Sequence, residues 1–224
     1  MMVQQLQMPQ GYTQKMMSMM KEGGSMNYDF LSFSNFKSSQ LSGDVVSNIR
    51  LPLNMTRAKA ILAVPTDATV YSGSQRISGN GTYLVYQEGG TQNTADKQEF
   101  SDKSGLVGIS DNISDYQFFY DGKLNPSRRV DCKKTSSQYS ISQQPLIELE
   151  KALAMSNITP FSFRDFNNNF VIGRALSLHN GVYNTVGRDF NLQVNYEGTA
   201  PTKNKLWMSF ISHIRRIEFK GSGI

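Results

Sequence analysis

Residues 190–196 read FNLQVNY, and this stretch decides the fold class. Apolar and amide side chains alternate along it: the apolar residues are Phe190, Leu192, Val194 and Tyr196, and the amides are Asn191, Gln193 and Asn195. Successive side chains of a β-strand point to opposite faces. The alternation therefore predicts a strand with its apolar face toward a core and its amide face toward solvent.

Further short segments on the N-terminal and C-terminal sides of this stretch also predict strands. They are rich in apolar, aromatic and β-branched residues, and they are Tyr28–Phe33, Val45–Leu53, Ala58–Val64, Tyr83–Tyr86, Tyr116–Tyr120, Phe170–Leu178 and Trp207–Phe219. We expect Pro65 to close the third segment and Asp121-Gly122 to form a turn after the fifth. The apolar parity of the last segment slips near Ile211, which predicts a bulge.

One segment is strongly helical. Ser142 can cap it, Pro145 lies in its first turn, LIELEKALAM follows with leucines at helical spacing, and Asn157 and Pro160 end it. The sequence YTQKMMSMMK at residues 12–21 can form a second, short amphipathic helix with Thr13 as its N-cap. Many short strands, one definite helix and no βα repeat predict an all-β antiparallel sandwich or barrel with long loops.

The chain divides into two parts by composition. Residues 1–26 form an N-terminal arm or an inter-domain connection, and residues 27–224 form one β domain. The long polar segment Ser72–Gly105 is expected at a solvent-facing or intersubunit end of the sandwich, because it offers little to bury. The methionine strip of the arm is either packed on its own domain or a contact to a neighbouring copy; its residues are Met16, Met17, Met19 and Met20.

Charge and cysteine content give little support to several functional classes. The net charge is +5, but no run of five or more like charges occurs. The densest basic cluster combines Arg128-Arg129 and Lys133-Lys134 with nearby tyrosines; single-strand nucleic-acid binding there is weakly supported, and a solvated loop is favoured. Cys132 stands alone, which excludes an internal disulfide. No apolar run approaches the roughly 18 residues of a membrane span, and the first residues do not resemble a signal peptide.

Catalytic, cofactor-binding and metal-ligating sites are not predicted. His179 and His213 lie in separate strand segments, and a metal centre of the cupin type needs more imidazoles together with a carboxylate. No GxSxG nucleophile motif occurs. Asp111 and Asp115 have a spacing that permits an acid–base pair, but in SDNISDY they are better explained as turn and cap residues. Arg215-Arg216 places one arginine on each face of the last strand, so one of them is expected to be paired.

Six stretches in the same order resemble the major capsid proteins of polinton-like viruses, adintoviruses and virophages. They are TRAKAILAVPTD (Thr56–Asp67), ISDYQFFYDGKLNPSR (Ile113–Arg128), PLIELEKAL (Pro145–Leu153), FVIGRALSL (Phe170–Leu178), DFNLQVNY (Asp189–Tyr196) and TAPTKNKLW…RRIEFKG (Thr199–Gly221). The resemblance implies a jelly-roll sandwich and a structural capsid subunit without catalytic residues or cofactors. It implies assembly with itself, as a trimer, and with other capsid proteins in a virion built inside the host cell.

That family has two jelly rolls per chain, whereas this sequence has room for one and matches the C-terminal half. Three alternatives remain open. The first is a single-jelly-roll penton or minor capsid protein. The second is a carbohydrate- or receptor-binding sandwich, with a stacking platform made of Tyr83, Tyr86, Tyr116 and Tyr120. The third is an enzyme of the cupin type, which the shortage of histidines argues against.

Overall fold

The computed structural model describes residues 9–68, 108–110, 113–132, 143–160, 166, 170–177, 181–196, 201 and 204–220. Several sequence expectations lie outside these residues: the strand Tyr83–Tyr86, the segment Ser72–Gly105 that contains it, the cap Ser142, the candidate Asp111 and the candidate His179.

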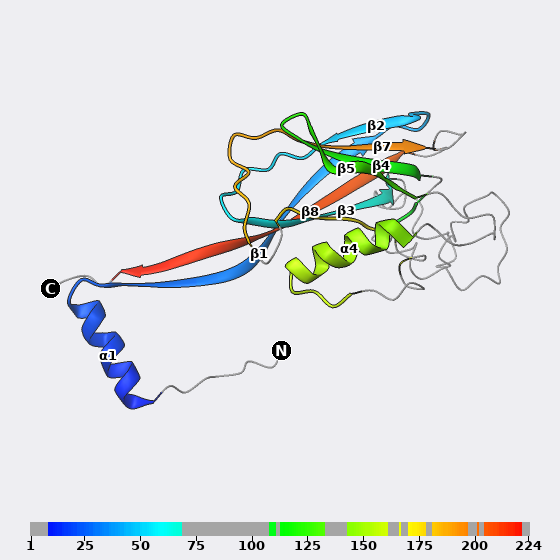
Figure 1. The fold of residues 1–224 in the computed structure, drawn as a ribbon. Coiled ribbons are helices and arrows are strands. Elements are labelled where there is room, and N and C mark those ends of the chain that lie inside the picture. The colour runs from blue at the N-terminus through cyan, green and yellow to red at the C-terminus, as the bar shows by residue number, and fades with distance from the viewer. Residues whose placement is uncertain are drawn as a thin grey trace, which may run out of the picture. The chain divides into compact units, whose positions relative to one another are not determined.

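The described residues form eight strands and two helices (Figure 1). The strands are β1 (Ser25–Gln40), β2 (Val46–Arg50), β3 (Ala58–Asp67), β4 (Ile113–Tyr120), β5 (Lys123–Asp131), β6 (Ile172–Ala175), β7 (Phe190–Tyr196) and β8 (Lys205–Lys220). The helices are α1 (Gln10–Lys21) and α4 (Gln143–Met155). The strongly helical segment of the sequence is α4, and the segment at residues 12–21 that can form a second helix lies in α1.

The strands make two four-stranded antiparallel sheets with the orders β1-β8-β3-β6 and β2-β7-β4-β5. Each strand of the first half of the chain pairs with its mirror counterpart in the second half: β1 with β8, β2 with β7, β3 with β6, and β4 with β5. This is jelly-roll topology, in which one long antiparallel hairpin is rolled into a double sheet. The predicted all-β antiparallel sandwich is confirmed.

The strand that decided the fold class has the predicted alternation. The burial of β7 alternates strictly, with Phe190, Leu192, Val194 and Tyr196 buried and the amides between them partly exposed. Its buried side chains belong to a continuous hydrophobic core between the sheets. The turn at Asp121-Gly122 is also confirmed, since both residues have positive φ angles (51° and 76°), as the tight turn of a two-residue hairpin requires.

Helix α4 ends as the sequence indicates and covers β6. Asn157 has a φ of 53°, a left-handed conformation that stops the helix. Leu149 of α4 lies so close to Gly173 of β6 that a Cβ at Gly173 would approach the Leu149 Cα to 2.6 Å. Only glycine allows the helix this close approach to the strand.

Strand β3 continues to Asp67, so the expectation that Pro65 closes it is wrong. Pro65 pairs with Trp207 of β8, whereas β6 pairs with β3 only as far as Ala63. One side of β3 is therefore not paired with a strand at Pro65, and a residue without an N–H is tolerated there.

The pairing of β3 with β8 shifts register between Ala58 and Ala60, opposite Ser212 and His213. The irregularity is therefore next to Ile211, where the slip in apolar parity predicts a bulge. The additional residue belongs to β3 and not to β8, because two steps along β3 correspond to one along β8.

The chain forms two compact units, and β1 and β8 run through both. One unit contains Met1–Ser32 with Ile214–Ile224, and the other contains Phe33–His213. In the first unit α1 begins at Gln10, with Pro9 at the N-cap position. The expectation that Thr13 is the N-cap of this helix is therefore wrong. No helix in the described part of the chain is long and apolar enough to cross a membrane.

Candidate functional site

Asp115, Cys132 and His213 are each buried or held by neighbouring residues. No group of three His, Cys, Asp or Glu residues that could hold a metal ion occurs among the described residues. His213 is buried, with its Nδ1 3.2 Å from the carbonyl oxygen of Ile211. Cys132 is buried, and desolvation raises the pKa of its thiol well above the ordinary range, so it is a poor nucleophile.

Asp115 is held by three neighbours rather than facing a substrate cavity. Its Oδ1 accepts hydrogen bonds from Arg129 Nη1 at 2.9 Å and from Asn195 Nδ2 at 2.6 Å. Its Oδ2 accepts one from the Ser114 hydroxyl at 2.9 Å. This carboxylate ties β4 to both β5 and β7, which agrees with a structural explanation of the aspartate.

The proposed aromatic platform for a glycan is not available on β4. Tyr116 and Tyr120 are buried, with 0% and 6% of their surfaces exposed. Burial raises the pKa of both hydroxyls, since desolvation disfavours the phenolate. A ring that stacks on a sugar must be accessible, so these two side chains belong to the core and this part of the alternative is wrong.

A partly buried ion pair fixes α4 to the sheets, and sequence reasoning missed it. Arg174 of β6 donates to Glu148 of α4 and to Asn125 of β5. The side chains of Arg174 and Glu148 are only 17% and 14% exposed. A signal was present in the sequence, because Arg174 interrupts an apolar strand and Glu148 lies among the leucines of the helix.

The basic cluster is not assembled in the described part of the chain. Arg129 is paired with Asp115 and also donates to Gln193 Oε1 at 3.2 Å. Tyr120 is buried, and Lys133-Lys134 lie outside the described residues. The arginine that was a candidate for nucleic-acid contact is therefore used to join three strands.

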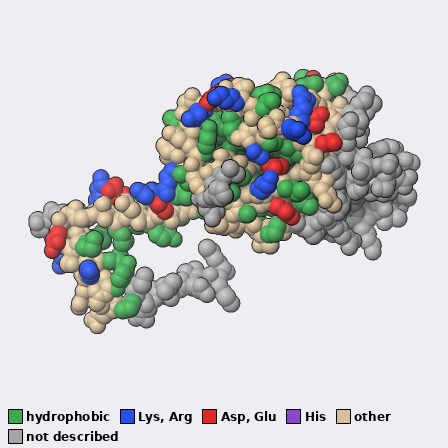
Figure 2. All heavy atoms as spheres, viewed as in Figure 1, with side chains coloured by type: hydrophobic (Ala, Val, Ile, Leu, Met, Phe, Trp, Pro, Cys, Tyr) green, Lys and Arg blue, Asp and Glu red, His purple; other side chains and the backbone are tan. Residues whose placement is uncertain are grey.

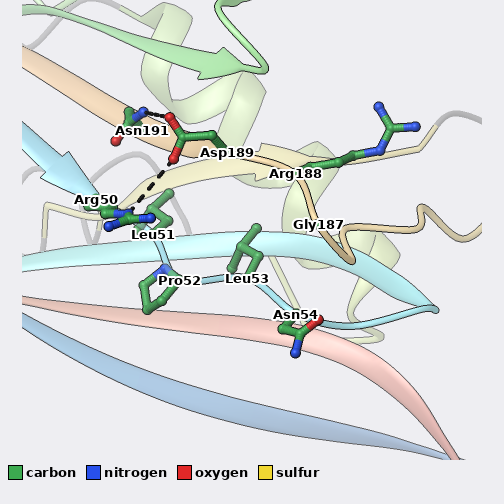
Figure 3. A pocket seen from close by; sticks show the side chains of 9 residues that line it. All are labelled: Arg50, Leu51, Pro52, Leu53, Asn54, Gly187, Arg188, Asp189 and Asn191. Carbon is green, nitrogen blue, oxygen red and sulfur yellow. Dashed lines mark hydrogen bonds and ion pairs between the residues drawn. The ribbon is translucent and has the colours of Figure 1, made fainter.

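The sandwich carries an open groove of about 690 Å³ beside the end of β2 (Figure 3). It lies between the segment 50–54 and the segment 187–191. The residues that line it are Arg50, Leu51, Pro52, Leu53, Asn54, Gly187, Arg188, Asp189 and Asn191. Arg50 forms a long ion pair with Asp189 at 3.8 Å, and Asn191 donates to the same carboxylate at 2.8 Å.

The groove offers charged and amide groups that can bind a polar ligand. The Arg50 side chain is 82% exposed, so its charge faces solvent. Arg188 points away from Arg50 in Figure 3, pairs with Asp121 at 3.0 Å and lies 5.2 Å from the centre of the Tyr183 ring. The carboxylate of the lining, Asp189, is held by Arg50 and Asn191, and the other lining side chains include no thiol, hydroxyl or imidazole.

A second, apolar groove of about 310 Å³ occurs in the unit that contains α1. Its lining residues are Tyr12, Lys15, Met16, Met19, Met20, Gly24, Ser25 and Met26. The structure thus brings together three of the four predicted contact residues, whereas Met17 lies outside the lining and is 60% exposed. Figure 2 shows hydrophobic side chains on the surface of this helix, and none of its residues is buried.

No family model matches the sequence, and no curated protein matches it. The fold is similar to that of VP54 of the virus PBCV-1, in a crystal structure fitted into a cryo-EM reconstruction of the virophage Sputnik. That match has a TM-score of 0.51 and 13% identity, and it covers 89% of this chain and 50% of the other. A quasi-atomic model of the PBCV-1 virus capsid matches with a TM-score of 0.50 and 13% identity, covering 94% of this chain and 52% of the other.

The chain therefore spans about half the length of the solved structures it matches. At this level of identity the similarity concerns the fold, and it confirms the jelly-roll sandwich that the resemblance implied. The match extends over nearly all of the chain. It therefore includes both sheets and is not confined to one hairpin.

Proposed function

We propose that this chain is a structural subunit of a viral capsid, a jelly roll that assembles with copies of itself and with other capsid proteins into the virion shell. The observation that carries the proposal is the fold match over 94% of the chain to a solved virus capsid. The role is structural rather than catalytic, because a shell needs buried contact area and not reactive groups.

The contacts within the sandwich support this role. Asp115 is held by neighbouring side chains, and Cys132 and His213 are buried. The Arg174–Glu148 pair and the close approach at Gly173 fix the helix onto the sheets. These contacts hold α4 in one position on the sandwich, which suits repeated packing in a shell.

The arm supplies a candidate oligomer contact in this proposal. Residues 1–26 act as the arm or connection, and residues 27–224 as the jelly-roll domain. The methionines of α1, Met16, Met17, Met19 and Met20, contact a neighbouring subunit in a trimer. Support comes from the apolar groove that three of them line and from the absence of buried residues in α1, since an isolated helix of 12 residues is marginal in water.

The test is the assembly state of the purified chain. Sedimentation and native mass spectrometry should find trimers or larger oligomers, and electron microscopy should find shells or sheets under crowded conditions. Threefold positions on the shell face support a major capsid subunit, whereas fivefold rings support a penton protein. A chain that stays monomeric up to millimolar concentration, with no particles, would overturn the proposal.

A further inference from the structure

The open groove beside the end of β2 lies where the pairing of β2 with β7 is interrupted. The backbone N–H of Leu51 donates to the carbonyl oxygen of Phe190 at 2.8 Å, as in a continuing ladder. The two segments meet again where the Thr185 N–H donates to the carbonyl oxygen of Met55 at 2.8 Å, and the Met55 N–H donates to the Thr185 hydroxyl at 2.8 Å. Between these contacts the segments part and form the two sides of the groove. All of its lining belongs to the unit Phe33–His213.

Local turns in both segments keep this opening from closing. Pro52 has no N–H to contribute to a ladder, and the Leu53 N–H donates to the carbonyl oxygen of Leu51 at 2.8 Å in a three-residue turn. On the other side the Arg188 N–H closes a four-residue turn at 3.2 Å, and Gly187 within it has a φ of 69°. The side chains of Leu51 and Leu53 are buried in the core. The groove is therefore a formed feature of the sandwich.

Polar groups lie at both ends of the groove and face solvent. The Arg50 side chain is 82% exposed, and its contact of 3.8 Å with Asp189 is the one interaction that it makes within the described part of the chain. Asp189 is 58% exposed and also accepts a hydrogen bond from Asn191. At the other end Asn54 is exposed, and its amide has no partner among the described residues. Figure 3 shows Pro52, which is also exposed, between these two ends.

The charges of the groove favour a neutral ligand that carries hydroxyl groups. An anion drawn to Arg50 would also meet the carboxylate of Asp189, and a cation drawn to Asp189 would meet Arg50. Arg188 does not change this balance, because it pairs with Asp121 at 3.0 Å. A hydroxyl both donates and accepts hydrogen bonds, so it can accept from a guanidinium and donate to a carboxylate. The amide of Asn54 offers both functions as well.

We propose that this groove binds a neutral saccharide. The charged groups of Arg50 and Asp189 are 3.8 Å apart, so neighbouring hydroxyls of one sugar ring reach both. The apolar C–H face of the ring lies on Pro52, and a further hydroxyl binds Asn54. The volume of about 690 Å³ is within the range of small-ligand sites, roughly 300–1,000 Å³. This binding goes beyond the structural role in a capsid and does not depend on it, because a single subunit contains the whole groove.

An extended peptide that adds a strand in the opening fits the groove less well. Such a peptide is bound by a regular row of backbone donors and acceptors. The wall at residues 51–53 offers no free donor, because the N–H groups of Leu51 and Leu53 are already used and Pro52 has none. The exposed polar groups of the groove therefore belong to side chains rather than to a strand edge, and this arrangement suits a sugar better than a peptide.

Nuclear magnetic resonance titration of the full chain tests the proposal. The probes are the methyl glycosides of glucose, galactose, mannose, fucose and N-acetylglucosamine. At least one of them should shift the signals of the Gly187 backbone amide and the Asn54 side-chain amide in a saturable way. The expected dissociation constant is millimolar, because an open groove buries only part of a small ligand. Methyl glucuronide, an anionic sugar, and methyl galactosaminide, a cationic one, should bind several-fold more weakly than the best neutral probe.

A pair of matched variants locates the site. Arg50→Gln removes the charged donor and should raise the dissociation constant about tenfold or more. Its melting temperature should equal that of the wild type, because the side chain is 82% exposed, so a loss of binding cannot be ascribed to unfolding. Arg128→Gln, the same change at an exposed position of β5, is the control and should leave the dissociation constant unchanged. Asn54→Ala should weaken binding by a smaller factor than Arg50→Gln.

The outcomes separate this inference from the proposed function. The absence of a saturable shift at Gly187 and Asn54 with every neutral probe, up to tens of millimolar, would overturn it. Tighter binding of the glucuronide, or binding that is unaffected by Arg50→Gln, would overturn it as well. Glycoside binding by a chain that forms no particles supports the groove site and counts against the shell. Particles formed by a chain that binds none of the probes leave the capsid role in place and remove the saccharide site.

Discussion

Trp207 donates its indole N–H to the Oε1 of Gln40 at 2.8 Å, and both side chains are buried. The same oxygen accepts the hydroxyl of Tyr196 at 2.9 Å. Tyr196 belongs to β7 in one sheet, whereas Gln40 and Trp207 belong to β1 and β8 in the other. A single amide oxygen thus accepts a hydrogen bond from one buried donor of each sheet. It thereby fixes the distance between the two sheets at this point.

Replacement of Gln40 should lower the free energy of unfolding of the sandwich. Gln40→Leu removes the shared acceptor and leaves two buried donors unpaired, which should cost about 2–4 kcal/mol. Ser39→Ala, at the exposed neighbouring position, should change it by less than about 0.5 kcal/mol. Urea unfolding followed by tryptophan fluorescence measures both. Equal effects would mean that the shared oxygen contributes nothing.

The Glu148–Arg174 pair should behave as a coupled unit. Glu148→Gln leaves a mostly buried guanidinium without its counter-charge and should cost about 3 kcal/mol. The double variant Glu148→Gln/Arg174→Met should cost clearly less than the two single changes added together. Lys151→Met is the control, because Lys151 pairs with the same carboxylate but is 55% exposed, and it should cost less than about 1 kcal/mol. Additive losses would contradict the coupling.

Stability should fall in alkaline solution because burial raises the pKa of Cys132, Tyr116 and Tyr120 in the folded chain. The stabilisation from each group is fully present below the unfolded-state pKa, about 9 for the thiol and 10 for the phenols. It is lost as the pH rises from there toward the folded value, by about 1.4 kcal/mol per pH unit and group.

Melting temperatures measured from pH 7 to 11 should therefore be level at first and decline above about pH 9. In Cys132→Ala the decline should begin nearer pH 10, where the tyrosines alone contribute. Absorbance of tyrosinate from the two buried rings should appear together with unfolding. A decline that starts at the same pH in both proteins would show that the thiol is not involved.

The methionines of α1 should matter for oligomers and not for the sandwich. Met16/Met17/Met19/Met20→Ser should reduce the oligomeric fraction in sedimentation and leave the melting of the sandwich unchanged, because α1 buries none of its residues. Gln14→Ser, an exposed polar change on the same helix, is the control. Unchanged sedimentation of the methionine variant would exclude α1 as the contact.

The apolar groove beside α1 predicts that the four methionines contribute unequally to the contact. Met16, Met19 and Met20 line it, whereas Met17 does not. If the partner inserts a side chain into the groove, Met17→Ser alone should have a much smaller effect than Met16/Met19/Met20→Ser. Equal effects would place the contact on the whole helix surface.

Local patterns were enough to predict what is decided locally. The alternation along Phe190–Tyr196, the turn at Asp121-Gly122 and the stop at Asn157 each follow from the side chains and backbone preferences of a few neighbouring residues. Local reasoning also failed at two positions: Thr13 is not the N-cap of α1, and the strand expected to end at Pro65 continues to Asp67. The missing fact was that β6 stops pairing at Ala63, which no window of sequence around the proline contains.

Features that depend on distant partners could not be derived from one sequence. Gln40 is one of several polar residues in a strand that also contains apolar ones. Nothing in the neighbouring sequence shows that it contacts Trp207, 167 positions away. Arg174 and Glu148 were visible as charges in apolar surroundings, but their pairing required the placement of α4 on β6. The pairing of Asp29 in β1 with Arg216 in β8 likewise required the placement of two strands that are far apart in the sequence.

The mirror order of the strands also determines when each sheet can form as the chain is synthesised. The β4–β5 hairpin closes first, and each later strand must return to a partner made earlier. The delay between synthesis of a strand and synthesis of its partner is longest for β1. Gln40 of β1 contacts Trp207 of β8, 167 positions later, which takes about 10–30 s to synthesise at ordinary ribosomal rates. Among the described strand pairs, that of β1 with β8 is therefore the last that can form during synthesis.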